Sequence, residues 1–116
     1  MNRTVWAIVD DMFFASKIRA TAESLGVSIR FMRTFDAVIE GLENEKPDLV
    51  IFDLHNQKVD VLGSAKELKN MDKEIRLLGF FSHVEVELQR SALAAGFDRV
   101  LPRSAFTRDL ADILKG

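Results

Sequence analysis

The sequence predicts an α/β fold: a doubly wound, five-stranded parallel sheet with strand order 2-1-3-4-5 and five helices. Short apolar runs alternate five times with longer amphipathic segments, which is typical of parallel strands joined by helices. The run 49–52 is apolar throughout, which indicates a central strand covered on both faces. Residues 27–31 alternate and residues 99–101 form a short run, so both suit sheet edges.

Each expected element has its own local signal. The expected strands are the runs 4–9, 27–31, 49–52, 75–81 and 99–101. The expected helices carry apolar residues at helical spacing over 12–25, 35–42, 61–71, 84–95 and 106–114. Gly26 and Gly96 end two of these helices, Thr34 caps another, and Pro47 prevents helix before the third strand. Trp6 is expected in the core.

Composition narrows the class of protein. The chain has 116 residues, 47% of them hydrophobic, which predicts one domain over 1–116. It contains no Cys, which fits a reducing, cytoplasmic setting and excludes thiolate metal sites. The net charge is −2 and the basic residues are scattered, which argues against nucleic acid as a direct partner. No apolar run is long enough to span a membrane.

Three carboxylates are expected at one edge of the sheet. Asp10 and Asp11 follow the first strand, and Asp53 follows the third. In the predicted order these strands are neighbours, about 4.8 Å apart, beside the topological switch point where ligands of such sheets bind. Acids this close raise one another's pKa unless a cation intervenes, and hard oxygen ligands suit Mg²⁺. The sequence therefore predicts a magnesium site here.

Two further polar residues are expected at this edge. Ser82 ends the fourth strand, and Arg103 follows the fifth. A hydroxyl donor and a guanidinium that can contact two oxygens suit an anion carried by Asp53. His55 and His83 also fall near the site, although two loop histidines are more often plain solvated residues.

Together these motifs resemble the receiver domain of two-component response regulators, which has a flavodoxin-like fold. The resemblance covers residues 4–114 and rests on the acidic pair 10–11, the segment 46–54, Ser82 and the segment 96–98. It implies that Asp53 is the phosphoacceptor and that Ser82 is the switch hydroxyl. It also implies that Asp11, Asp53 and the backbone carbonyl of His55 bind Mg²⁺, with Asp10 helping through water.

The function implied by the resemblance is signalling rather than enzymatic. A partner histidine kinase or phosphotransfer protein would phosphorylate Asp53, and output would follow by protein contact. The family's usual output face is the fourth helix, fifth strand and fifth helix, which here carry Glu85, Glu87, Gln89, Arg90, Arg99, Arg108 and Asp109.

Departures from the family pattern favour an alternative. Arg103 stands where the family usually has Lys, Ser104 where it has Pro, and Val100 where it has a switch aromatic. Arg is longer and planar, so it does not substitute simply for Lys, and a trans peptide is expected before Ser104. These changes suit a pseudo-receiver, an interaction module that works without phosphorylation.

A third interpretation is a flavodoxin-like cofactor binder or a small phosphohydrolase. The sequence has no Gly-rich phosphate or dinucleotide loop. His55 stands where a phosphoaspartyl hydrolase would need a second Asp as general acid.

Overall fold

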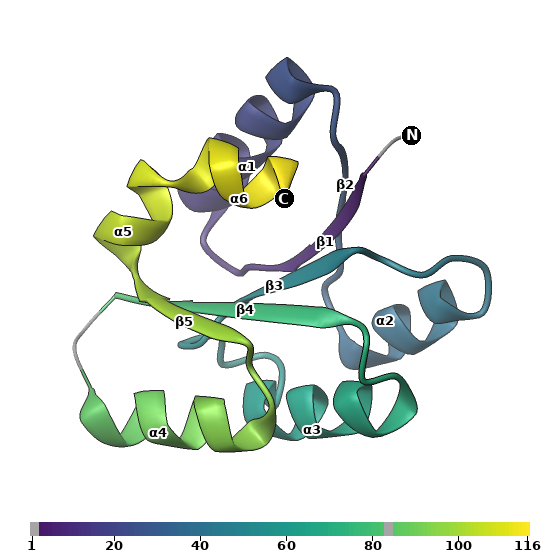
Figure 1. The fold of residues 1–116 in the computed structure, drawn as a ribbon, viewed down its shortest axis with the longest axis vertical. Helices are drawn as coiled ribbons and strands as arrows, with labels where there is room; N and C mark the ends of the chain where they lie inside the picture. The colour runs from purple at the N-terminus through teal and green to yellow at the C-terminus, as the bar shows by residue number, and fades with distance from the viewer. Residues whose placement is uncertain (1–2, 83–84) are drawn as a thin grey trace.

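A computed structural model describes residues 3–82 and 85–116 of the chain (Figure 1). Five parallel strands form one sheet in the predicted order, β2-β1-β3-β4-β5. The strands are β1 (Thr4–Ile8), β2 (Ser28–Phe31), β3 (Leu49–Asp53), β4 (Arg76–Phe81) and β5 (Arg99–Pro102). β3 is buried along its whole length, as its apolar run predicts, and the edge strands β2 and β5 are partly exposed.

Helices cover both faces of the sheet, as Figure 1 shows. The helices are α1 (Met12–Leu25), α2 (Phe35–Leu42), α3 (Val61–Met71), α4 (Val86–Ala95), α5 (Arg103–Arg108) and α6 (Leu110–Lys115). α1, α5 and α6 pack on one face, and α2, α3 and α4 pack on the other. Because neighbouring strand residues point to opposite faces, Phe80 joins the first layer and Phe81 the second.

Trp6 packs between the sheet and α2, on the face covered by α2, α3 and α4. Its side chain is fully buried, and its indole N–H donates to Glu45 Oε1 at 2.8 Å. A Cβ atom at Gly41 of α2 would lie 2.8 Å from the Trp6 ring, so only glycine allows this approach. The predicted core position of Trp6 is therefore confirmed.

The predicted helix ends are also present. Thr34 caps α2 by accepting the Ala37 N–H at 3.1 Å. Gly26 and Gly96 end α1 and α4 in the left-handed conformation, with φ of 70° and 116°. Among the described residues, no helix has the length and apolar character needed to cross a membrane.

The described residues contain six helices, not the predicted five. The last predicted helix is divided at Asp109, whose φ of −100° and ψ of 8° depart from helical values. Arg108 binds the Asp109 carboxylate through Nε and Nη2 at 3.0 and 3.1 Å. The apolar spacing continues through the break, since Phe106 and Leu110 are both buried, so the periodicity of the sequence does not reveal it.

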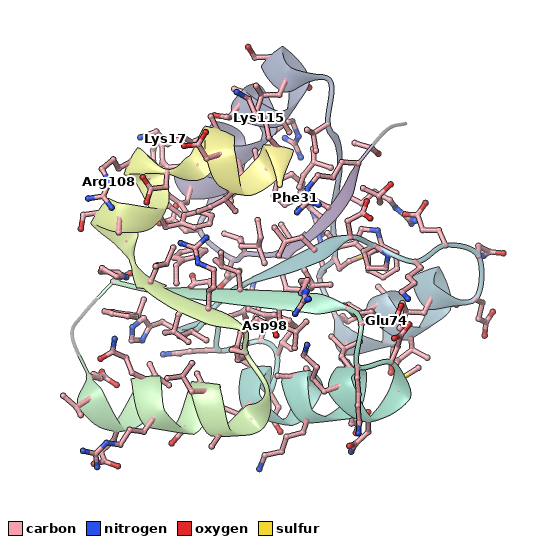
Figure 2. The ribbon with its side chains drawn as sticks, viewed as in Figure 1. Lys17, Phe31, Glu74, Asp98, Arg108 and Lys115 are labelled. Atoms are coloured by element: carbon pink, nitrogen blue, oxygen red, sulfur yellow. The ribbon has the colours of Figure 1, made fainter. Side chains whose placement is uncertain are left out.

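Asp98, in the loop before β5, forms a hydrogen bond to the backbone of the neighbouring strand β4 (Figure 2). Its Oδ2 accepts the Leu77 N–H at 2.8 Å and Lys69 Nζ at 2.9 Å, and Arg76 lies 3.5 Å from Oδ1. Burial alone would raise the pKa of Asp98, but the bonds from Leu77 and Lys69 outweigh burial and lower it. The folded protein therefore favours the ionised carboxylate.

We expect Asp98→Asn to lower the free energy of unfolding by about 1 kcal/mol at neutral pH. The folded pKa lies below the ordinary value of 3.8, so the stabilisation is present above that pH and is lost as the pH falls through the folded pKa. Urea unfolding between pH 7 and pH 2.5 should show the two proteins converging. Glu87→Gln, which removes a highly exposed carboxylate from the first turn of α4, is the control and should change the free energy of unfolding by no more than about 0.5 kcal/mol. A constant difference at all pH values would contradict the assignment.

Candidate functional site

The carboxyl ends of β1 and β3 bring the predicted acids to one edge of the sheet. β1 pairs with β3 in the register Ile8 to Phe52, so the residues that follow both strands emerge side by side. Asp11 immediately precedes α1, and Asp53 ends β3. Both residues therefore lie at the carboxyl ends of neighbouring strands, as predicted.

Asp53 is a buried acid. Only 9% of the residue is exposed, and its Oδ1 accepts the backbone N–H of His55 at 2.9 Å. Burial raises the pKa of Asp53, because a charged carboxylate loses hydration there. The hydrogen bond from His55 and the charges of His55 and Arg103 oppose this rise, and the charge of Asp11 adds to it. Asp53 is therefore electrostatically linked to both Asp11 and Arg103.

Asp11 is held by two donors. Its Oδ1 accepts the Phe14 N–H at 3.1 Å, which makes it the N-cap of α1, and its Oδ2 binds Arg103 Nη2 at 3.0 Å. The hydrogen bond from Phe14 is the main cause of a lowered pKa for Asp11, and Arg103 contributes to it. We predicted that crowding would raise the pKa of these acids unless a cation intervenes. For Asp11 the pKa is lowered instead, because the Phe14 N–H and the Arg103 guanidinium, the kind of intervening cation that the prediction excepted, both favour the ionised form.

Arg103 lies between the acids and an aromatic cluster. It begins α5 directly after β5, and its guanidinium carbon lies 4.4 Å from the centre of the Phe14 ring. Phe14, Phe80 and Phe106 pack together with ring centres 4.7 to 5.5 Å apart. This support orients the cation, and sequence analysis missed it because Phe14 carries only the ordinary signal of a core residue.

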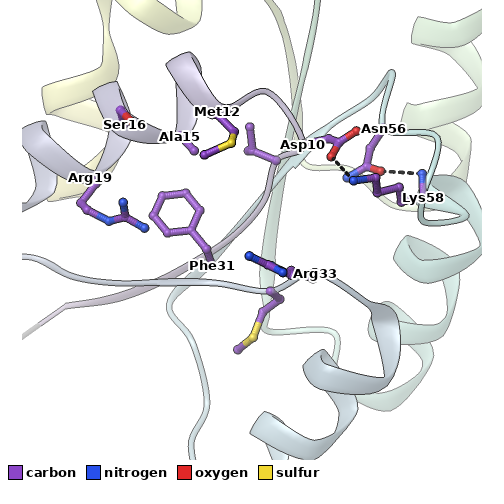
Figure 3. Close-up of a pocket in the computed structure, with 11 residues that line it drawn as sticks. Asp10, Met12, Ala15, Ser16, Arg19, Phe31, Arg33, Asn56 and Lys58 are labelled. Atoms are coloured by element: carbon purple, nitrogen blue, oxygen red, sulfur yellow. Dashed lines mark hydrogen bonds and ion pairs between the residues drawn. The ribbon is translucent and has the colours of Figure 1, made fainter.

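Asp10 binds a different cation from the one that Asp11 binds. Its Oδ1 forms an ion pair with Lys58 Nζ at 3.1 Å, and both residues line a hollow beside α1 and β2 (Figure 3). Lys58 lies in the segment between β3 and α3, and sequence analysis did not assign it a role. The only sequence signal for this partner is that a basic residue follows Asp53 within the same connecting segment.

The expected metal ligands are only partly assembled. Within residues 3–82 and 85–116, no three His, Asp or Glu side chains are grouped as metal ligands. Asp11 and Asp53 are coupled, whereas Asp10 is drawn toward Lys58. Two basic side chains therefore neutralise the acids in this arrangement.

The remaining predicted residues lie as follows. Ser82 is exposed directly after β4, and His55 is half-buried beside Asp53. The described part of the chain contains no cis peptide bond, as expected for Ser104. Val100 is half-buried and packs toward the α2–α4 face. His83 lies outside the described residues.

We expect Asp11→Asn to lower the free energy of unfolding by up to about 1 kcal/mol in metal-free buffer. Asn still caps a helix, so the loss comes from the ion pair with Arg103 and from the charge at the helix end. Asp60→Asn is the matched control, because Asp60 caps α3 in the same way and no ion pair to it occurs among the described residues. Urea unfolding measures both. A gain in stability for Asp11→Asn would show that repulsion from Asp53 exceeds the attraction of Arg103.

Comparison with known proteins identifies the fold. No protein-family model matches the chain, and no curated protein matches it in sequence. A response regulator from Thermotoga maritima superposes with a TM-score of 0.84 at 16% identity, over 99% of this chain and 96% of that one. A CheY-like response regulator receiver domain protein from Methanospirillum hungatei JF-1 gives 0.85 at 17% identity, over 99% and 92%.

A third solved structure carries a chemical modification. It is a response regulator protein from Burkholderia pseudomallei with a phosphorylated aspartic acid, a calcium ion and citrate. It superposes with a TM-score of 0.82 at 20% identity, over 97% of this chain and 66% of that one. The structural neighbours of this chain are response regulator receiver domains, and the chain has their fold.

Proposed function

We propose that the chain is a signalling receiver that accepts a phosphoryl group on Asp53. The observation that carries the proposal is the grouping of a buried Asp53 with Asp11 and Arg103 at the switch point of a receiver fold. Asp53 supplies a nucleophile, Asp11 a metal ligand and Arg103 a counter-charge. The phosphorylated aspartic acid in the Burkholderia structure supports the same chemistry on this fold.

The proposed reaction transfers a phosphoryl group from a histidine nitrogen of the donor protein to a carboxylate oxygen of Asp53. A carboxylate oxygen of Asp53 attacks the phosphorus of the donor, and the bond from phosphorus to the donor's histidine nitrogen breaks. The bonding electron pair leaves on that nitrogen. The new acyl phosphate carries more negative charge than the carboxylate, and Arg103, whose charge already acts on Asp53, can contact two of its oxygens. Ser82, at the end of β4, is the proposed hydroxyl donor.

The donor set fits Mg²⁺, with one rearrangement. Asp11, Asp53 and the backbone carbonyl of His55 would hold it with hard oxygen atoms, and Asp10 would help through water. Arg103 must then leave Asp11 Oδ2, which it now binds at 3.0 Å. When bound, the metal would neutralise charge on the transferred group.

The partner for this reaction is a histidine kinase or phosphotransfer protein. Met12 and Phe13, at the start of α1, are 81% and 90% exposed beside the acids. Exposed apolar side chains at the rim of a site suit contact with a protein donor. Output through α4, β5 and α5 remains our expectation for the downstream target.

Mass spectrometry of the intact protein tests the proposal. We expect incubation with acetyl phosphate and Mg²⁺ to add one phosphoryl group to the native chain and none to Asp53→Asn. Asp48→Asn is the control, because Asp48 is an exposed aspartate that binds the Thr4 N–H at the opposite edge of the sheet. Equal labelling of the native chain and Asp53→Asn, or no labelling of either, would refute phosphorylation at Asp53.

The second candidate is a pseudo-receiver, and the ion pairs favour it. Arg103 and Lys58 already neutralise Asp11 and Asp10, so the resting acids attract a metal less strongly. Val100 offers no aromatic ring to move on activation. Beryllofluoride with Mg²⁺ should shift amide signals near Asp53 in a receiver and should leave them unchanged in a pseudo-receiver.

A further inference from the structure

A hollow of about 360 Å³ opens beside the acids, between the start of α1, the end of β2 and the segment between β3 and α3 (Figure 3). Its size falls within the usual range for small-molecule sites. Its lining includes three basic residues from three separate segments, namely Arg19, Arg33 and Lys58, and a single acid, Asp10. The protein as a whole has a net charge of −2, so this hollow is a local concentration of positive charge.

The two ends of the hollow differ in chemistry. At one end the Arg19 guanidinium lies over the Phe31 ring, 4.8 Å from its centre. This stacking fixes a flat, weakly hydrated cation on which a planar aromatic group can stack. Val9 and the buried Met32 add apolar surface to the lining. This end suits an aromatic base.

The other end is rich in hydrogen-bond donors. Figure 3 shows Lys58, Asp10 and Asn56 together, with Arg33 between them and the Arg19–Phe31 pair. Asn56 Oδ1 accepts the Lys58 N–H at 2.8 Å, which leaves its amide N–H groups as the donors it can offer. Within residues 3–82 and 85–116, Arg33 forms no ion pair, and the one acid available to Lys58 is Asp10. Among those residues, Arg33 is therefore a cation without an acidic partner, which suits a phosphate group, and Lys58 can add a second contact while its ammonium also binds Asp10.

We propose that this hollow binds a small phosphate ester of a planar base, a nucleoside monophosphate in its simplest form. The base stacks at Arg19 and Phe31, and the phosphate contacts Arg33 and Lys58. The site is distinct from Asp53, since the hollow lies on the Asp10 side of β1 and its lining does not include Asp53, Asp11 or Arg103. Asp10, which would help to bind Mg²⁺ through water, also lies in the lining, but the phosphoacceptor does not, so we expect binding without phosphorylation of the chain.

An amide NMR titration with AMP, adenosine and inorganic phosphate tests the proposal. We expect AMP to give saturable shifts at residues 31–33 and 56–58 and to bind at least tenfold more tightly than adenosine or phosphate. Arg33→Gln should weaken AMP and phosphate by about tenfold and leave adenosine unchanged. Arg19→Gln should weaken AMP and adenosine and leave phosphate unchanged. Arg90→Gln, on α4 and far from the hollow, should alter none of them.

Several results would overturn the proposal. If AMP binds no more tightly than phosphate, or if neither Arg33→Gln nor Arg19→Gln changes its affinity, the attraction to this surface is only diffuse and electrostatic. A single-stranded oligonucleotide that binds far more tightly than AMP would show an extended nucleic-acid surface instead. Asp53→Asn should bind AMP as the native chain does, so loss of phosphorylation and loss of nucleotide binding are separable outcomes. Thermal melts of each exposed-residue variant establish that it is folded.

Discussion

We expect Phe80→Ala to lower the free energy of unfolding by about 3–5 kcal/mol. The Phe80 ring is 1% exposed, and it stacks on Phe106 and packs against Phe14, each with ring centres 4.7 Å apart. Removing it creates a cavity in the centre of one layer, which adds to the lost burial of the ring. A domain of this kind is commonly stable by only about 5–15 kcal/mol, so the loss is a large fraction of the total.

Phe13→Ala is the matched control for this substitution. Phe13 is 90% exposed, so the same change of residue should alter stability by no more than about 0.5 kcal/mol. Urea unfolding of the three proteins measures both effects. A loss below about 1.5 kcal/mol for Phe80→Ala would mean that neighbouring side chains collapse into the space, and that the ring cluster does not hold Phe14 rigidly beneath Arg103.

The second large effect is expected at Arg103. Arg103→Gln should bind Mg²⁺ about tenfold more tightly than the native chain, because the guanidinium competes for Asp11 Oδ2 and repels a nearby dication. At a Mg²⁺ concentration one hundred times the dissociation constant, a metal that binds only the folded state stabilises it by about 2.7 kcal/mol. The variant should therefore gain thermal stability at lower Mg²⁺ concentrations than the native chain.

Thermal melts over a series of Mg²⁺ concentrations measure this shift. Lys17→Gln is the control, because Lys17 is an exposed cation on α1 that forms no ion pair with the described acids. It should leave the Mg²⁺ dependence unchanged. Equal or weaker binding by Arg103→Gln would contradict the competition and would mean that metal and guanidinium occupy separate positions.

The positions of the acids in the candidate site could be predicted from local sequence. The ion pairs that these acids form could not. The positions of Asp11 and Asp53 at the ends of neighbouring strands follow from the strand pattern and the sheet order. The direction in which each acid interacts depends on partners far away in sequence, since Arg103 is 92 residues from Asp11. The sequence therefore predicted three neighbouring acids with Arg103 beside them, but it did not predict that Arg103 binds Asp11 or that Lys58 binds Asp10.

The strands, the sheet order and the core could all be predicted from the sequence, because apolar periodicity and helix-ending residues such as Gly26 act locally. The sequence did not reveal the break at Asp109, since the apolar spacing runs through that residue and only backbone geometry marks it. The pairing of Asp11 with Arg103 and of Asp10 with Lys58 is visible only in the three-dimensional structure. Those pairings depend on which side chains the folded chain brings within about 3 Å of one another, the range of charge-assisted hydrogen bonds. Asp10 and Lys58, for example, come from two connecting segments far apart in the sequence, and the pattern along the chain does not encode their distance.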